Sequence, residues 1–251
     1  MSSGRTASGA GGAGHPRRRE PAPVSGALAV CVAGARGRLG SLVCEAVAAA
    51  PDLNLSATLV RGQRASEVLS GATLDVLVDV SLAPASRQLV PLALELGIAT
   101  VVGTSGLSGS DLEAMDQASR RAGVGALVVP NFSLGAVLQM QAAAAIAPHL
   151  PCRRLLETHH PAKRDAPSAT ALATAAAVAA ATGGHAPAIT SERREGCVAR
   201  QELRFGDEAE QLTLVHEVAD RRAYLPGVLL AVRRVRSLRG LHQGLAAVLE
   251  C

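Results

Sequence analysis

Aromatic side chains are almost absent from this chain of 251 residues, which has no tryptophan, one tyrosine and two phenylalanines. Phe132, Phe205 and Tyr224 offer no stacking platform for nucleic-acid bases, and the core has to be aliphatic. The net charge of +4 does not indicate such a partner either, because four arginines and one glutamate in residues 1–26 supply most of it. We therefore expect no nucleic-acid partner.

Other absences exclude further classes of protein. The five cysteines form no C-x-x-C pair, so we expect a reducing compartment, the cytoplasm, and neither a disulfide framework nor a metal site. No apolar run is long enough to span a membrane without a charge or a proline, so we expect no membrane partner. Residues 1–26 lack the apolar centre of a secretory signal, and their Gly, Ala, Ser, Arg and Pro predict a disordered, dispensable tail, with an organelle transit peptide as the alternative.

Hydrophobic residues make up 48% of the chain, enough for a sizeable core, and order is expected from residue 27 onward. An apolar run over 27–32 predicts a strand, and residues 41–50 have helical character. Between them stands a glycine-rich turn: Gly34, Ala35, Arg36, Gly37, Arg38, Leu39 and Gly40. Strand, glycine turn and helix form the context in which backbone N–H groups bind a pyrophosphate, although the G-x-x-G-x-x-G spacing also suits a plain β-α turn.

The next predicted strand, residues 53–60, ends in Arg61 without an acidic residue. An acid at this point suits the ribose hydroxyls of NAD, whereas an arginine suits the 2′-phosphate of NADP. The pattern favours NADPH, or use of both NADPH and NADH, unless Arg61 is only a solvated loop residue.

Regular alternation of strands and helices continues to residue 131 and predicts an α/β fold with a parallel sheet covered on both faces. The predicted strands are 74–80, 98–102 and 127–129, and the predicted helices are 85–96 and 110–122. Ligands bind at the carboxyl ends of such strands, so we expect these residues to face the cofactor: Gly103, Thr104, Ser105, Val129, Pro130, Asn131 and Phe132.

From residue 134 the pattern changes to a smaller α+β unit. We expect helices over 134–147 and 169–181, a short strand over 154–157, and a two-stranded antiparallel unit formed by 201–205 and 211–217. A helix over 227–235 and a segment over 245–249 are expected to return to the first unit. The predicted domains are thus 27–131 with 226–251 for the dinucleotide, and 132–225 for the substrate.

The densest chemistry lies between Glu157 and Thr170, where His159, His160 and Lys163 precede the start of a helix. Imidazole transfers protons near neutral pH, and an ammonium beside a helix N-terminus binds an anion. This predicts proton transfer to a bound acid; a polar loop whose histidines cap nearby backbone groups is the alternative.

Five segments together resemble the 4-hydroxy-tetrahydrodipicolinate reductase family, in order over residues 28–249. They are Gly34–Gly40, Gly103–Gly106, Pro130–Gly135, Glu157–Thr170 and Asp220–Arg233, and the H-H-x-x-K-x-D-A-P-S element within the fourth is the most specific. The resemblance implies an oxidoreductase of diaminopimelate and lysine biosynthesis that uses NADPH or NADH, forms a homo-oligomer, usually a tetramer, and reduces a small cyclic imine with two carboxylates. By position, His159 would be the general acid or base and Lys163 the proton donor or electrostatic partner, while His160, Ala169 and Thr170 would hold a substrate carboxylate.

The chain departs most from the family at three places, besides milder departures at Pro84, a proline displaced by one residue, and Ser105, which replaces a threonine. Ala169 stands where the family has glycine, and the segments 62–71 and 196–201 are shorter than usual. We expect the second shortening to remove structure from the substrate domain's sheet and its subunit contacts. These departures keep open an alternative, a catalytically impaired nucleotide-binding paralogue that serves as a partner or regulatory subunit.

Overall fold

The computed structural model describes Met1 and residues 26–249 of the chain. Nearly all of the predicted tail, residues 1–26, lies outside the described residues, so that expectation stays a prediction. Among the described residues, no helix combines the length and the apolar character needed to cross a membrane.

The first sheet has six strands, all parallel to their neighbours, in the order β10-β5-β4-β3-β1-β2. The strands are β1 (Leu28–Ala33), β2 (Leu53–Leu59), β3 (Val76–Asp79), β4 (Ala99–Val102), β5 (Gly125–Val128) and β10 (Gly240–Gln243). Every residue of β3, β4 and β5 is buried, as the continuous apolar runs require when both faces of a sheet are covered. The predicted parallel, Rossmann-like sheet is confirmed, and β10 is an additional strand that the sequence pattern did not reveal.

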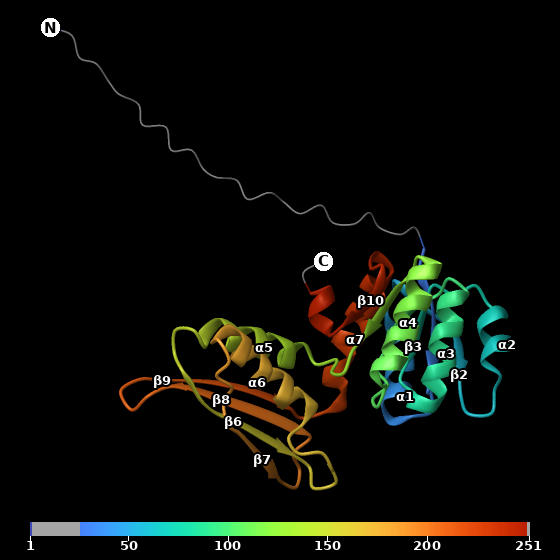
Figure 1. The fold of residues 1–251 in the computed structure, drawn as a ribbon. Helices are drawn as coiled ribbons and strands as arrows, with labels where there is room; N and C mark the ends of the chain where they lie inside the picture. Colours follow the sequence, from blue (N-terminus) through green and yellow to red (C-terminus); the bar gives the residue numbers. More distant parts are fainter. Residues whose placement is uncertain (2–25, 250–251) are drawn as a thin grey trace.

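Helices cover this sheet on both faces (Figure 1). They are α1 (Arg38–Ala49), α2 (Ala65–Ser70), α3 (Ala83–Glu95), α4 (Gly109–Ala122) and α7 (Leu225–Arg234). Alternate residues of β1 enter opposite cores: Val30 and Val32 pack with α1 and α7, whereas Cys31 and Ala33 pack with α2 and α3. The shortened segment 62–71 still supplies a helix, α2, whose Leu69 is buried.

The second sheet has four strands, in the order β7-β6-β8-β9. They are β6 (Cys152–His159), β7 (Ile189–Arg193), β8 (Ala199–Gly206) and β9 (Gln211–Val218). The predicted antiparallel pair, β8 with β9, is confirmed, and it belongs to a larger sheet: β6 pairs antiparallel with β8, and β7 pairs parallel with β6. The short 196–201 segment leads into an eight-residue strand, Ala199–Gly206, which pairs along its length with β9. The expected loss of structure relative to the family stays a prediction.

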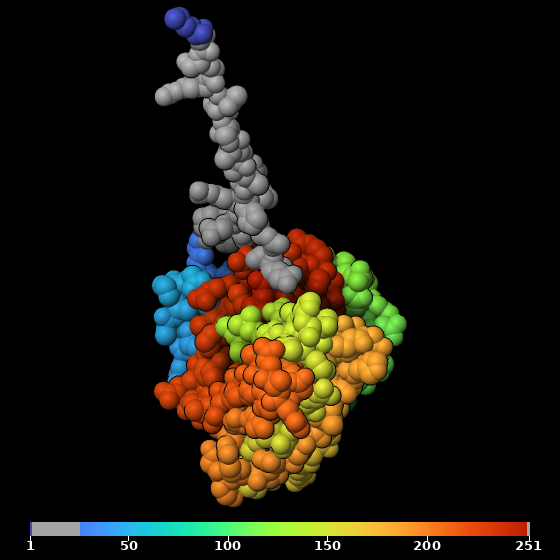
Figure 2. Space-filling model, turned by 90° about the vertical axis from the view of Figure 1, so that its left-hand side faces the viewer, coloured from blue at the N-terminus to red at the C-terminus, as the bar shows by residue number. Residues whose placement is uncertain are grey.

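One face of the second sheet carries α5 (Leu134–Ile146) and α6 (Ala169–Ala181) (Figure 1). Buried residues of both helices, such as Ala143 and Val178, share a core with Leu203 and Phe205 of β8. In Figure 2 these segments, yellow to orange, form the near face of the molecule, and the blue and green segments of the first sheet's side lie behind. The second sheet therefore forms a separate layer that the chain enters after β5.

The chain returns to the first sheet after β9. A 3-10 turn, η1 (Arg221–Tyr224), precedes α7, whose Val228 and Val232 belong to the core of the first sheet. After η2 (Val235–Ser237), strand β10 pairs with β5, and the segment expected at 245–249 is a 3-10 turn, η3 (Leu245–Val248). Two crossings, before α5 and before α7, thus join the layers and place the carboxyl edge of the first sheet beside the second.

Candidate active site

A cleft of about 410 Å³ lies between the two layers. From the carboxyl edge of the first sheet it is lined by Leu39, Gly103, Ser105, Val129, Pro130, Asn131 and Phe132. From the second layer it is lined by His159, His160, Lys163, Ser168, Ala169 and Thr170. The structure thus brings together most of the site residues that the sequence indicated, from segments that lie far apart in the chain.

The remaining predicted residues do not line this cleft: Gly34, Ala35, Arg36, Gly37, Arg38, Arg61 and Thr104. Most of them form the turn between β1 and α1, at the point where the strand order reverses between β1 and β3. Open α/β sheets bind ligands at such a switch point. These residues therefore remain candidates for the part of a dinucleotide that extends beyond the cleft.

The glycine turn has the close geometry that a phosphate loop requires. Gly34 has a φ of +79°, and a Cβ there would lie 2.7 Å from the Val80 carbonyl oxygen. A Cβ at Gly40 would overlap the carbonyl oxygen of Gly34, whose oxygen also accepts a 2.8 Å hydrogen bond from Gly37 N. Helix α1 starts after Gly37 without a side-chain cap and without an acidic residue in its first turn, so its free N–H groups can bind a pyrophosphate.

A buried carboxylate holds the loops after β3 and β4. Asp79 is fully buried and accepts hydrogen bonds from the hydroxyls of Ser81, Ser86 and Thr104. The Thr104 side chain is thus a tether between loops, and Gly103 beside it leaves the space that the Phe132 ring fills. These contacts fix one wall of the cleft.

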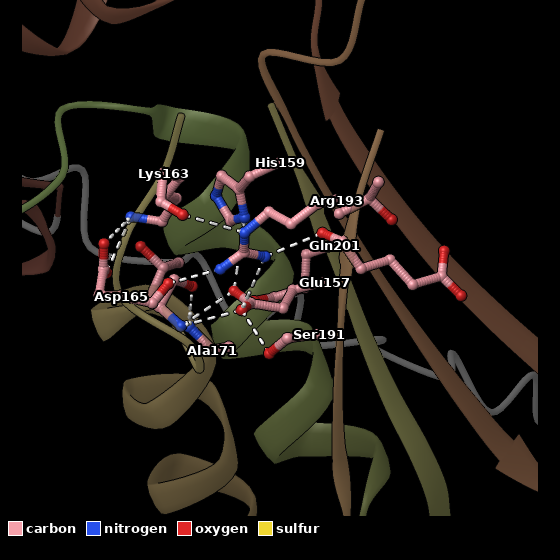
Figure 3. Close-up of polar contacts among 12 residues, drawn as sticks. Glu157, His159, Lys163, Asp165, Ala171, Ser191, Arg193 and Gln201 are labelled. Carbon is pink, nitrogen blue, oxygen red and sulfur yellow. Dashed lines mark hydrogen bonds and ion pairs between the residues drawn. The ribbon is translucent and has the colours of Figure 1, made fainter. Parts of the chain in front are cut away.

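His159, at the end of β6, lines the cleft beside a buried carboxylate. Its side chain is 15% exposed, and its Nδ1 lies 3.6 Å from Oε2 of the buried Glu157 (Figure 3). Burial lowers the pKa of the His159 imidazole; the nearby carboxylate of Glu157 opposes this change, and Lys163 and Arg193 reinforce it. In the free protein the ring is therefore biased toward its neutral form.

Lys163 lies in the loop between β6 and α6 and is the only lysine of the chain. Its Nζ contacts both carboxylate oxygens of Asp165, at 2.9 and 2.8 Å, and this hydrogen bond lowers the pKa of Asp165. Arg193 of β7 holds the same loop by donating to the carbonyl oxygens of Lys163, at 3.1 Å, and Asp165, at 2.6 Å (Figure 3). Two charged side chains thus keep the ammonium beside the cleft.

The N-terminus of α6 forms the floor of the second layer's part of the cleft. Ser168 caps the helix by accepting a 3.2 Å hydrogen bond from Ala171 N, which leaves the N–H groups of Ala169 and Thr170 without a helical partner. Ala169 is exposed, so its Cβ occupies open space at the helix start. Asn131 reaches across from the first layer and donates to the Thr170 hydroxyl at 3.1 Å. A carboxylate can bind here at the positive end of the helix.

Several cleft residues had no assigned role in the sequence interpretation: Arg200, Gln201, His216, Arg221 and Tyr224. Gln201 is fixed by the buried Gln139 and by Thr174, and His216 Nε2 lies 3.0 Å from the Ser133 hydroxyl. For Gln201 and His216 the sequence signal is weak: alternation along β8 and β9 marks the face toward the helices, but only strand pairing places that face over the cleft.

We predict that Arg193→Ala loosens the loop that carries Lys163. The guanidinium supplies two charge-assisted hydrogen bonds to backbone carbonyls there, and such bonds contribute about 1.5–3 kcal/mol each. Hydrogen exchange of the amides of residues 160–165, measured by mass spectrometry, should become at least about tenfold faster. Arg194→Ala, which removes an exposed neighbouring arginine, is the control and should leave exchange unchanged; equal exchange in both variants would contradict this role.

Comparison with known proteins gives consistent matches along the chain. Residues 28–132 match the family model described as dihydrodipicolinate reductase, N-terminus, and residues 135–249 match the model of its C-terminus. The chain is 38% identical to the 4-hydroxy-tetrahydrodipicolinate reductase of Beutenbergia cavernae, over 89% of this chain and 99% of the relative. It is 40% identical to that of Moorella thermoacetica, over 73% of this chain and 76% of the relative.

Solved structures show the same fold. Dipicolinate-bound dihydrodipicolinate reductase from Paenisporosarcina sp. TG-14 superposes with a TM-score of 0.79 at 24% identity, covering 89% of this chain and all of the other. GenD2 from gentamicin A biosynthesis, in complex with NAD, gives a TM-score of 0.65 at 13% identity, with 92% of each chain covered. Matches to both family models over nearly all described residues, together with these relatives, show that the chain belongs to the dihydrodipicolinate reductase family.

Proposed function

We propose that this protein reduces 4-hydroxy-tetrahydrodipicolinate to tetrahydrodipicolinate with NADPH or NADH, in diaminopimelate and lysine biosynthesis. The supporting observation is that one cleft joins the carboxyl edge of a Rossmann-like sheet to His159, Lys163 and the open N-terminus of α6. Relatives at 35–40% identity carry the name of this activity. The proposed division is a dinucleotide domain, 27–131 with 226–251, and a substrate domain, 132–225.

The names of the proposed substrate and product define what the site has to supply. The product has hydrogen where the substrate has a hydroxyl group, so the reaction adds a hydride and a proton and releases water. A reduced nicotinamide bound at the first layer supplies the hydride. The chain's own residues have to hold a dianion, exclude bulk water and provide the proton.

The cleft contains groups suited to each task. The N–H groups of Ala169 and Thr170 can hold one carboxylate together with His160, which lines the same cleft, and the Lys163 ammonium can attract negative charge on the same ligand. His159 can carry the proton, because its ring lines the cleft and is mostly shielded from solvent. On the other side, Gly34–Gly40 would hold the pyrophosphate, and Gly103, Ser105 and Val129–Phe132 would contact the nicotinamide half.

The protein works in the cytoplasm under this proposal, which agrees with the cysteines. Cys31, Cys44, Cys152 and Cys197, the cysteines among the described residues, are all free. A reducing compartment keeps thiols in this state.

We further propose that the chain forms a homo-oligomer, a tetramer, through the open face of the second sheet. Helices α5 and α6 cover only one face, and the other carries a charged row in which Glu202 contacts Arg200 and Arg204, each at 2.6 Å. Exposed Val215 lies opposite Glu202 in the strand pairing. Light scattering should give a molar mass of four times the 25.5 kDa chain, and a monomer at assay concentration would contradict this assembly.

Substitutions at His159 and Lys163 test the reaction itself. His159→Gln and Lys163→Ala should each lower kcat by on the order of 100-fold or more, because each removes a proton-transferring group. NADPH affinity should stay nearly unchanged, since both residues lie on the substrate side of the cleft. Oxidation of NADPH with enzymatically generated substrate is the measurement, and normal rates in either variant would remove its proposed role.

Matched variants separate charge from proton transfer. His149→Gln, at an exposed histidine outside the cleft, should behave as the unmodified protein. Lys163→Arg keeps the positive charge but introduces a group that does not release its proton, so KM should stay close to normal while kcat falls. If Lys163→Arg retains kcat, Lys163 acts only as a charge. No turnover in the unmodified protein despite intact NADPH binding would instead select the impaired paralogue.

Arg61 tests the choice of cofactor. It is exposed just beyond β2, next to β1 and its glycine turn. If it contacts the 2′-phosphate, Arg61→Ala should raise the Kd of NADPH about tenfold and leave that of NADH unchanged. Arg64→Ala, three residues away and paired with Glu67 at 3.2 Å, is the matched control. Titration of each variant with NADPH and with NADH measures the two Kd values. An equal change in both Kd values in Arg61→Ala would rule out a 2′-phosphate contact.

A further inference from the structure

One ring nitrogen of the proposed proton carrier has no partner. His159 Nδ1 is buried and makes no hydrogen bond, and among the described residues only Thr100 Oγ1 shares this condition. Buried polar side-chain atoms nearly always have partners, so an unpaired one beside a reaction site needs an explanation. The nearest carboxylate oxygen, Glu157 Oε2, stands at 3.6 Å, slightly beyond hydrogen-bond length.

The two oxygens of Glu157 are used differently (Figure 3). Oε1 accepts hydrogen bonds from the Ser191 hydroxyl, at 2.7 Å, and from Ser168 N, at 3.0 Å. Oε2 accepts only the longer bond from Ser168 N, at 3.1 Å, and is the oxygen nearest the His159 ring. One lone pair of Oε2 therefore remains available on the side of the histidine.

Glu157 is also kept ionised despite its burial. Burial would raise the pKa of this carboxyl group, but the hydrogen bonds from Ser168 and Ser191 outweigh that effect, and His159 adds to them, so the pKa is lowered. A carboxylate is an acceptor only. If His159 comes within hydrogen-bond distance, its Nδ1 must therefore carry the proton.

We propose that Glu157 is a positioning residue that accepts a hydrogen bond from Nδ1–H of His159 during the reaction, leaving Nε2 as the nitrogen that exchanges the proton with the substrate. This inference rests on the proposed function. It assigns a role to a residue that touches neither substrate nor cofactor, since Glu157 does not line the cleft.

The arrangement fixes which ring nitrogen of His159 transfers the proton. With Nδ1–H held by Glu157, the neutral ring has its lone pair on Nε2, and the charged ring has its transferable proton there. The charged groups that face the ring are Glu157 on its own strand, Lys163 and Asp165 in the following loop, and Arg193 on β7. A dianionic ligand adds negative charge to this set, which favours the imidazolium and draws Nδ1–H toward Oε2.

The same carboxylate connects the proton carrier to the substrate's anchor. Ser168 N, which donates to Glu157, belongs to the residue that caps α6, and the next N–H groups are those proposed to bind the substrate carboxylate. Glu157 thereby sets the position of His159 relative to that carboxylate. Positioning of this kind affects kcat more than ground-state binding.

A substitution tests the role through the pH dependence of kcat. Glu157→Gln keeps the shape but removes the negative charge, so it should lower kcat by on the order of 100-fold while NADPH affinity is unchanged. The charge of Glu157 favours the imidazolium, so its loss lowers the pKa of His159, and the alkaline decline of kcat should move to lower pH. Lower kcat with an unmoved alkaline limb would show that Glu157 is only structural.

Two further variants complete this test. Glu192→Gln makes the same change of charge at an exposed residue of the neighbouring strand and should leave both kcat and the pH profile unchanged. Glu157→Asp keeps the charge with a shorter side chain, so kcat should fall while the alkaline limb stays near its normal pH. If the alkaline decline of kcat moves equally in Glu157→Asp and Glu157→Gln, the electrostatic part of the proposal is overturned.

A second measurement needs neither turnover nor a variant at Glu157. Nitrogen-15 NMR of labelled histidine rings reports which nitrogen carries the proton, and His159→Gln identifies the signal of His159. We expect the neutral ring to carry its proton on Nδ1, both in the free protein and with dipicolinate added. A proton on Nε2 in both states would overturn the proposal even if the enzyme is active. An inactive protein with the proton on Nδ1 would instead contradict the proposed function alone.

Discussion

Burial of the Glu157 carboxylate is the constraint on which the geometry of the second layer depends. An unpaired buried carboxylate is costly, so the chain has to bring donors to it, and these donors come from Ser168 before α6 and Ser191 on β7. With His159 on the same strand, three segments that the sequence separates are held in one arrangement. An aliphatic core alone, with nearly no aromatic side chains, would leave such segments free to slide, because small apolar contacts specify position only weakly.

Local patterns were sufficient to predict the elements that bury continuous apolar runs. The parallel strands β1, β3 and β4 lie within two residues of their predicted positions, and α6 spans the predicted residues 169–181, since Pro167 and Ser168 mark its start and Gly183 follows its end. Strands β7 and β10 could not be predicted in this way. Each is short and mostly polar, and it becomes a strand only because β6 or β5 offers an unpaired edge.

The residues of the candidate site also fall into two groups: those that a local sequence pattern predicts, and those that only the tertiary structure brings to the cleft. His159, His160 and Lys163 are close in sequence, so their grouping follows from one loop, and the glycine turn follows from its own strand and helix. Arg200, His216 and Tyr224 reach the cleft through the register of β8 and β9 and through the return of the chain to α7, which no local pattern encodes. The role of Glu157 was hidden for a related reason: its donor Ser191 lies 34 residues away on a strand that the pattern did not reveal.

The single lysine bears on what the cleft must do. Lys163 is the only lysine among the 25 basic Lys and Arg residues, and all others are arginine. If position 163 needed only a positive charge paired with Asp165, arginine would serve at least as well, because its planar fork binds a carboxylate through two parallel hydrogen bonds. An ammonium differs from a guanidinium chiefly in being able to give up a proton. The presence of an amine at this one position, next to the His159 imidazole, therefore favours proton transfer over charge alone as the purpose of Lys163.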